Sequence, residues 1–350
     1  MTCIKPILPT DLIQQLKALL DSAKSVSIVC HMTPDGDALG SSLFLCRVMR
    51  NSGRKATVLV PDQPPANLMF LPGADEIVVA SCHPERARRA LVDSDLTFCL
   101  DFNDLKRIDR LAPMVEQSGT PRIVVDHHLN PAIEAEVVIS HPEKSSTSAL
   151  IFEVIDQLGM ADRVDVEAAE CCCAGMMTDT GNFSYNSCDP ALYLTMARLV
   201  EIGVDKDRLY KLLFNTNSLE RVRLMGYGQC YKLDLLNAGR GALITLSLDE
   251  LRQFHYQKGD TEGLVNVPLS IPGVVYSVYL REDEPQFVKV SMRSKGQFSV
   301  KHLCEKYFGG GGHLNAAGGE LKCGLSEAIE KLLSIQPEIE LMLQEIPVED

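Results

Sequence analysis

The chain has 350 residues, of which 45% are hydrophobic and 23% charged, and this composition excludes disorder and fibrous repeats and suits two average domains. Lysine and arginine total 34 against 47 acidic residues, so the formal net charge of −13 disfavours diffuse attraction to a long nucleic acid. No stretch reaches the roughly 18 to 20 consecutive apolar residues of a membrane span, and the polar N-terminal stretch lacks the layout of a secretory signal. We therefore expect a cytoplasmic protein that neither enters a membrane nor binds long duplex nucleic acid.

In the N-terminal half, short apolar runs alternate with helical patterns, which is typical of a parallel sheet wound with helices. Strands are predicted at 25–30, 56–60, 76–80, 96–100 and 122–125. Between them, apolar residues recur at three-to-four spacing over 37–50 and 83–93, which predicts helices. The predicted class is α/β, with a doubly wound and mainly parallel sheet.

From Ser145 onward the pattern becomes helical, and strands return only after about Asn237. Helices are predicted at 145–159, 164–177, 189–203, 205–214 and 218–233, strands at 241–248, 274–282 and 286–294, and a further helix at 299–308. We therefore expect three parts: a first domain at 1–189, a helical connector at 190–236, and a smaller α/β domain at 237–350.

Histidine and aspartate residues follow three of the predicted strands, at the point where each strand ends. These residues are His31, Asp101, Asp126, His127 and His128. Ligands of open parallel sheets bind outside the carboxyl ends of the strands, so these side chains are expected to meet in one crevice. The Pro-Asp-Gly turn after His31 would aim Asp35 and Asp37 toward the same place, although such a turn is also common on ordinary surfaces.

A further carboxylate, Asp179, lies near the end of an apolar helix, where it would be costly unless it is paired or binds a metal. A helix-capping role beside Gly181 is the alternative. The combined set offers two imidazoles and four carboxylates: His31, Asp35, Asp37, Asp101, His127 and Asp179. Such a set without thiolates suits Mn²⁺, with Mg²⁺, Co²⁺ or Fe²⁺ as competitors. Two bridged metal ions would use all four carboxylates, and the implied reaction is metal-assisted phosphoester hydrolysis.

A glycine run at 309–312 precedes His313 in the predicted second domain. Glycines without Cβ atoms let backbone N–H groups approach an anion, and His313 could add a charged hydrogen bond. A flexible linker is the alternative, but the following His-Leu-Asn-Ala-Ala and apolar residues are not typical of linkers. The run therefore predicts an anion-binding site.

The motifs H-x-x-P-D-G-D-A-L-G, L-D, D-H-H, T-D-T-G and G-G-G-G-H-x-x-A-A-G occur in this order between residues 31 and 319. As an ordered set they resemble the DHH phosphoesterases, in the branch with a DHH-associated C-terminal domain that includes bacterial nanoRNases and pAp phosphatases. The resemblance implies that the six histidine and aspartate residues named above bind two Mn²⁺ ions, with Asp101 and Asp179 bridging them.

The same resemblance implies roles for residues near these motifs. It places His128 at the scissile phosphate, where it would help the leaving oxygen depart and act with Asp101 in catalysis, and it makes Asp126 a partner that orients a histidine. It also implies that the phosphates and nucleotide of the substrate are bound by Arg107, Arg293, Gly310, Gly311, Gly312 and His313. Both arginines could instead be ordinary surface charges.

The function implied is hydrolysis of very short oligoribonucleotides, such as nanoRNA and pApA, to mononucleotides, together with removal of the 3′-phosphate from pAp. A cyclic di-AMP or pApA phosphodiesterase is the alternative within the same class, and a nucleotide-binding regulator without activity is the alternative outside it. The low positive charge fits a short substrate, because few groups besides the metals could grip phosphates. The helical middle of the chain leaves a homodimer open.

Overall fold

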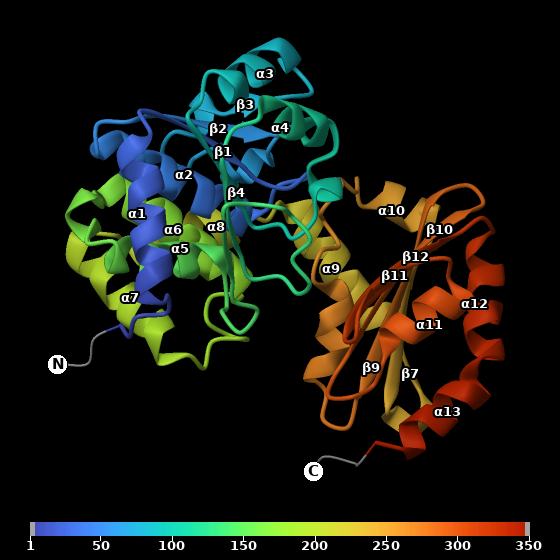
Figure 1. Cartoon of the computed structure of the whole chain (residues 1–350). Coiled ribbons are helices and arrows are strands. Elements are labelled where there is room, and N and C mark those ends of the chain that lie inside the picture. Colours follow the sequence, from blue (N-terminus) through green and yellow to red (C-terminus); the bar gives the residue numbers. More distant parts are fainter. Residues whose placement is uncertain (1–3, 347–350) are drawn as a thin grey trace. The chain divides into compact units, whose positions relative to one another are not determined.

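The computed structural model describes residues 4–346 and divides into two compact units, residues 1–216 and 217–350 (Figure 1). The division falls inside 190–236, the range that the sequence predicts to be a helical connector. Helices do occupy most of that range, but a separate connector stays a prediction. Within the described residues no helix is both long enough and apolar enough to span a membrane.

The first unit is built on a six-stranded parallel sheet with the strand order β3-β2-β1-β4-β5-β6. Its strands are β1 (Ser25–Val29), β2 (Lys55–Val60), β3 (Val78–Val79), β4 (Leu96–Leu100), β5 (Arg122–Asp126) and β6 (Val137–Ser140). The predicted doubly wound parallel sheet is confirmed. The strand order reverses between β1 and β4, and such a switch point opens a crevice at the carboxyl ends of the two strands.

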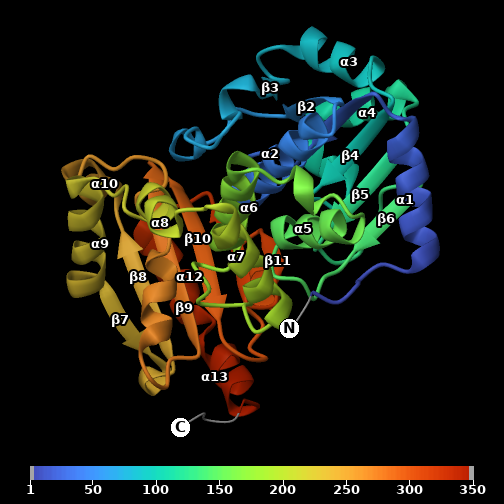
Figure 2. The ribbon, with the colours of Figure 1, turned by 90° about the vertical axis from the view of Figure 1, so that its left-hand side faces the viewer.

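Helices cover both faces of this sheet (Figure 2). The helices of this unit are α1 (Thr10–Ser22), α2 (Gly36–Asn51), α3 (Pro84–Val92), α4 (Ala112–Ser118), α5 (Thr147–Gln157), α6 (Val166–Asp179), α7 (Pro190–Ile202) and α8 (Lys206–Phe214). The last three pack mainly on other helices and not on the sheet itself. Alternate strand residues feed two cores: Ile28 packs into the core with α2, α5 and α6, and Val29 into the core with α3 and α4. Burial on both faces explains why the strands are continuous apolar runs.

The third predicted strand is shorter than expected. Residues Ala74–Glu76 form a 3₁₀ turn instead of strand, because Gly73, at φ 81°, turns the chain just before it. In the first unit, helices α1 and α4 and the edge strand β6 were not predicted. Strand β6 has only four residues, so its apolar run Val137–Ile139 is too short to mark a strand by itself.

Helices α2 and α6 cross at a pair of glycines. A Cβ atom at Gly40 would lie 2.6 Å from the Cys171 carbonyl oxygen and 2.9 Å from the Gly175 Cα atom. A Cβ atom at Gly175 would lie 2.0 Å from Ser148 Oγ and 2.9 Å from an oxygen of Asp37. The two helix backbones therefore touch, and this close contact carries Asp37 on α2 toward Asp179 at the end of α6.

The second unit contains a six-stranded sheet with the order β11-β12-β10-β9-β8-β7, antiparallel except between β8 and β9. Its strands are β7 (Leu233–Leu236), β8 (Gly241–Leu246), β9 (Tyr276–Glu284), β10 (Phe287–Ser294), β11 (Gly311–His313) and β12 (Ala316–Leu321). One face packs on α11 (Val300–Tyr307), α12 (Leu325–Ser334) and α13 (Gln336–Gln344), and the other on α9 (Leu219–Tyr231) and α10 (Leu248–Gln253). The predicted helix at 218–233 ends at Tyr231, where the chain turns into the edge strand β7.

Candidate metal centre

The structure brings together the histidine and aspartate residues that follow the parallel strands. His31, after β1, places its Nε2 atom 3.5 Å from Asp101 Oδ2, after β4. His127, after β5, places its Nε2 atom 3.5 Å from Asp101 Oδ1 and 3.5 Å from Asp179 Oδ2. These contacts lie at the strand-order switch point, where the sheet topology predicts a ligand crevice.

Asp101 is the residue that links these contacts. Its backbone is left-handed, with φ 64°, a conformation that costs a non-glycine residue roughly 1–3 kcal/mol and that is over-represented at functional sites. Three overlapping groups have potential ligand atoms within 4.8 Å of one another: Asp101, His127 and His128; His31, Asp35 and Asp101; Asp37, His127 and Asp179. Because Asp101 belongs to two of the groups, one carboxylate could serve two adjacent ions.

Both imidazoles are held in the tautomer that a metal requires. The Nδ1 atom of His31 lies 2.8 Å from the Met32 carbonyl oxygen, and that of His127 lies 3.2 Å from the Lys144 carbonyl oxygen. A carbonyl oxygen can only accept, so Nδ1 carries a proton in both rings, and Nε2 is the nitrogen that faces the carboxylates and would bind a metal after losing any proton it carries. This is the usual second hydrogen bond of a metal-binding histidine.

Two helix N-termini hold the aspartates of the first motif. Asp35 caps α2, its Oδ1 accepting hydrogen bonds from the amides of Asp37 and Ala38, and its Oδ2 lies 3.7 Å from His31 Nε2. The buried carboxylate of Asp37 accepts hydrogen bonds from the amides of Thr147 (2.6 Å) and Ser148 (2.9 Å) at the start of α5. Free amides and the helix dipole stabilise a negative charge at such a position.

The segment around Thr147 also belongs to this site, although the sequence motifs did not predict it. Its hydroxyl donates a 2.9 Å hydrogen bond to Asp101 Oδ1, and Thr147 is fully buried. The signal was present in the Ser-Ser-Thr-Ser run at 145–148, because hydroxyl residues before an apolar helix mark a helix N-terminus.

The aspartates crowd one another, and this crowding shifts their pKa values. Burial, together with the charges of Asp101 and Asp179, raises the pKa of Asp37 well above its usual range. Burial also raises the pKa of Asp179 to about 7. For Asp101, burial is outweighed by the hydrogen bond from His31 and by nearby histidine charges, which lower its pKa to about 2. Burial likewise opposes the charged form of His31, but Asp101 and Asp35 raise the pKa of His31 to about 10. The cluster therefore demands positive charge, from protons or from cations.

The donor set fits a divalent ion that prefers oxygen with some nitrogen. The one thiol beside it in sequence, Cys30, is fully buried, and burial raises its pKa far above the usual range, so it stays protonated. A thiol that stays protonated is a poor metal ligand. Carboxylates and imidazoles without thiolate suit Mn²⁺, Mg²⁺ or Co²⁺ better than a closed zinc site.

His128 is bound to Asp126 through its Nδ1 atom, so its other ring nitrogen, Nε2, points away from Asp126. Its Nδ1 atom lies 2.7 Å from Asp126 Oδ1, and Asp126 is completely buried. Burial opposes the charge on His128, but the hydrogen bond to Asp126 and the charge of Asp101 outweigh it and raise the pKa of His128. Arg107, in the 3₁₀ segment Leu105–Leu111, is near enough for its charge to lower that pKa in part.

The remaining predicted residues lie in the second unit. Arg293 on β10 pairs across the sheet with Ala316 of β12, which pairs with His313 of β11. Its half-buried guanidinium donates to the Met292 carbonyl oxygen, and no ion pair involving Arg293 occurs within residues 4–346. Burial lowers its pKa. An arginine so placed is available to an anion.

The glycine run differs from the open loop that the sequence suggests. Gly311–His313 is the strand β11, paired with β12. A Cβ atom at Gly310 would lie 1.8 Å from the Gly318 carbonyl oxygen, and one at Gly312 would lie 2.4 Å from the Ala316 carbonyl oxygen. These two glycines therefore allow close strand pairing, whereas a Cβ atom at Gly311 would meet only the Glu305 side chain, at 3.8 Å, an ordinary contact distance. Binding of substrate by Gly310, Gly311, Gly312 and His313 stays a prediction.

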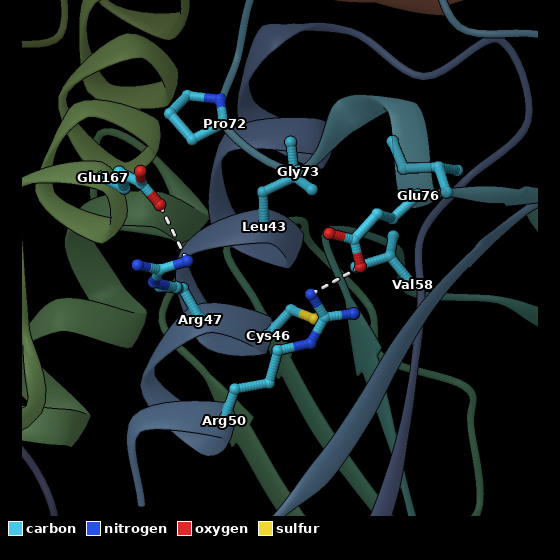
Figure 3. Close-up of a pocket in the computed structure, with 10 residues that line it drawn as sticks. Leu43, Cys46, Arg47, Arg50, Val58, Pro72, Gly73, Glu76 and Glu167 are labelled. Atoms are coloured by element: carbon cyan, nitrogen blue, oxygen red, sulfur yellow. Dashed lines mark hydrogen bonds and ion pairs between the residues drawn. The ribbon is translucent and has the colours of Figure 1, made fainter.

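A separate pocket of about 140 Å³ lies beside α2 (Figure 3). Its two arginines are already paired: Arg47 contacts Glu167 at 2.7 Å and Asp165 at 2.8 Å, and Arg50 contacts Glu76 at 2.8 Å. None of the predicted site residues lines it. We therefore assign it no ligand.

Comparison with known proteins identifies the family. Residues 25–176 match the model of the DHH family, N-terminal domain, and residues 242–337 match the model of the DHHA1 domain. The bifunctional oligoribonuclease and PAP phosphatase NrnA of Thermus thermophilus is 33% identical over 315 residues, covering 88% of each chain. The cyclic-di-AMP phosphodiesterase GdpP of Bacillus subtilis is 25% identical over 333 residues, covering 91% of this chain and 48% of its own.

Among solved structures, the crystal structure of an exopolyphosphatase-related protein from Bacteroides fragilis superimposes with a TM-score of 0.92. It is 39% identical, and the match covers 97% of this chain and 99% of the other. The chain therefore belongs to the DHH family of phosphoesterases, hydrolases that act on phosphoester bonds, and carries a DHHA1 domain in its second unit.

Proposed function

We propose that this protein is a Mn²⁺-dependent phosphoesterase that hydrolyses short oligoribonucleotides to mononucleotides and also removes the 3′-phosphate of pAp. The observation that carries the proposal is the convergence of six histidine and aspartate side chains, Asp101 among them, in overlapping groups of potential ligands. A relative that this chain matches over 88% of its length is named for both activities. The proposed ligands are His31, Asp35, Asp37, Asp101, His127 and Asp179. Bound divalent ions would supply Lewis acidity at the phosphate and lower the pKa of water.

The chain's own residues would bind and protonate the substrate. His128 is held through Nδ1 by Asp126, so its Nε2 is free to donate a hydrogen bond to a phosphate oxygen and then to protonate the leaving oxygen. Its raised pKa favours the protonated form that this role needs. Arg107, near His128, would contact the same phosphate, and the planar guanidinium suits that contact.

The second unit would bind the far end of the substrate. Arg293 has no carboxylate partner in the described chain, and Arg293, Ala316 and His313 form one cross-strand row. Directly opposed residues of antiparallel strands project on the same face of a sheet, so an arginine and an imidazole share that face. With a net charge of −13 these local groups would have to supply most of the affinity, which limits the substrate to a few phosphates.

The proposal is tested by product chromatography with Mn²⁺-supplemented protein and, in parallel, pApA, pAp, cyclic di-AMP, a long RNA and pyrophosphate. We expect AMP from pApA and from pAp, and little product from long RNA or pyrophosphate. Asp101→Asn should abolish turnover, whereas Arg47→Met, outside the site, should retain it. Comparable turnover of long and short RNA, or no turnover with metal bound, would contradict the proposal.

Cleavage of cyclic di-AMP is the second candidate, because the relatives also include cyclic-di-AMP phosphodiesterases of which this chain covers about half the length. The same donors and the same phosphate-binding residues would serve that reaction. The reaction with cyclic di-AMP distinguishes the two candidate functions. Turnover of cyclic di-AMP at least as fast as that of pApA would favour the second candidate.

A further inference from the structure

A buried lysine that the proposed mechanism does not use lies next to the candidate metal centre. Lys144 is in the segment that joins β6 to α5, and only 7% of its surface is exposed. Its ammonium lies 2.8 Å from each carboxylate oxygen of Glu153, inside α5, and 2.9 Å from an oxygen of Asp189, the N-cap residue of α7. All three donors of the ammonium therefore have a carboxylate acceptor.

Stability alone does not explain this cluster. Glu153 is only 2% exposed, so two charges have been removed from water. Desolvation offsets most of the attraction within such a pair, and apolar residues of similar size often stabilise a fold equally well. A buried ion pair is therefore better understood by what it holds in place.

The backbone of Lys144 supplies the carbonyl oxygen that accepts from His127 Nδ1, at 3.2 Å. Three residues farther on, the amide of Thr147 holds Asp37 and its hydroxyl holds Asp101. Apart from Lys144, the start of the segment is fixed by one long-range backbone bond, from the His141 amide to the Asp126 carbonyl oxygen. The ion pairs of the Lys144 ammonium therefore link this segment to helices α5 and α7.

We propose that Lys144 is a positioning residue for the metal centre: its ammonium, bound between Glu153 and Asp189, fixes the carbonyl oxygen that orients His127. The inference rests on the proposed function, since it takes His127 as a metal ligand. Partners of this kind typically change metal affinity by about 10–100-fold when they are removed.

The test compares Lys144→Met and Lys144→Met/Glu153→Leu with the wild type, in the full chain. The double variant replaces the buried pair by apolar side chains and so avoids leaving Glu153 charged and unpaired. Mn²⁺ affinity is measured by calorimetry, and the hydrogen bond of His127 Nδ1–H by ¹H–¹⁵N NMR of the metal-free protein. Arg47→Met is the matched control, because Arg47 also bridges two carboxylates, Asp165 and Glu167, but does not touch the site.

We expect the double variant to melt close to the wild type without metal, to bind Mn²⁺ about 10–100-fold more weakly, and to show a weakened hydrogen bond at His127 Nδ1. Arg47→Met should bind Mn²⁺ as the wild type does. Unchanged Mn²⁺ affinity and an unchanged Nδ1 hydrogen bond of His127 in the folded double variant would overturn the inference. A loss of affinity that only parallels a loss of folded protein would also overturn it. A wild type that binds no Mn²⁺ would instead refute the proposed function.

Discussion

Replacing Gly40 by alanine tests how closely the two helices that carry Asp37 and Asp179 must pack. The new Cβ atom would lie 2.6 Å from the Cys171 carbonyl oxygen and 2.8 Å from the Gly175 backbone nitrogen. Ordinary contacts begin near 3.4 Å, so α2 and α6 must separate by about 0.8 Å. Since both obstacles are backbone atoms, no side-chain rotation relieves them.

The expected cost follows from these contacts. Overpacking of a core costs about 1–3 kcal/mol, and a backbone obstacle favours the upper end of that range. Alanine regains roughly 0.5–1 kcal/mol in a helix because glycine loses more conformational entropy. We therefore expect the free energy of unfolding to fall by about 2 kcal/mol, and the melting temperature by roughly 4–8 °C. Separation of the helices should also weaken Mn²⁺ binding.

The assay is urea unfolding followed by circular dichroism in EDTA, with Mn²⁺ affinity measured separately by calorimetry. Gly226→Ala is the matched control: it lies inside α9, and its Cβ atom would meet nothing within 4 Å. It should raise stability by about 0.5–1 kcal/mol. If Gly40→Ala were as stable as Gly226→Ala and bound Mn²⁺ normally, the argument from helix contact would be wrong.

The other predictions concern the charge of the site, its proton donor and the second unit. Mn²⁺ at 100 times its dissociation constant should add about 2.7 kcal/mol and raise the melting temperature by roughly 5–10 °C, reversibly with EDTA; an unchanged melting curve would count against a preformed site. His128→Ala should lower kcat by about 10²–10⁴-fold while metal content and circular dichroism stay as in the wild type. Arg293→Ala should raise KM for pApA with little change in kcat, in steady-state assays. Burial favours the neutral form of Glu250, but hydrogen bonds from Ser247, Tyr227 and Lys232 outweigh it and lower its pKa to about 2. The ionised Glu250 side chain therefore contributes fully to the free energy of unfolding above about pH 5, and this contribution is lost as the pH falls toward 2. In urea unfolding, Glu250→Gln should lower the free energy of unfolding at pH 7 but hardly at pH 2.5. An equal loss at both pH values would refute the role given to the ionised Glu250.

Much of the first unit could be predicted from local pattern. Apolar runs such as 96–100 are buried on both faces of a parallel sheet, and this burial produces the continuous pattern that marked them. The gathering of His31, Asp101 and His127 followed from topology, because parallel strands end at one edge. Strand β6 was missed because it is an edge strand that alternates buried and exposed positions over only four residues.

The features that only the tertiary structure decided depend on contacts between residues far apart in the sequence. The sequence by itself determined the fold class and predicted which histidine and aspartate residues would meet, because periodicity and strand-end position are local properties. It could not reveal the hydrogen bonds of Thr147 to Asp37 and Asp101, since they join residues 110 and 46 positions apart. Nor could it reveal that Gly312 lacks a Cβ because strand β12 lies against it. Hydrogen-bond partners and backbone approach are set by packing between elements, which no local pattern records.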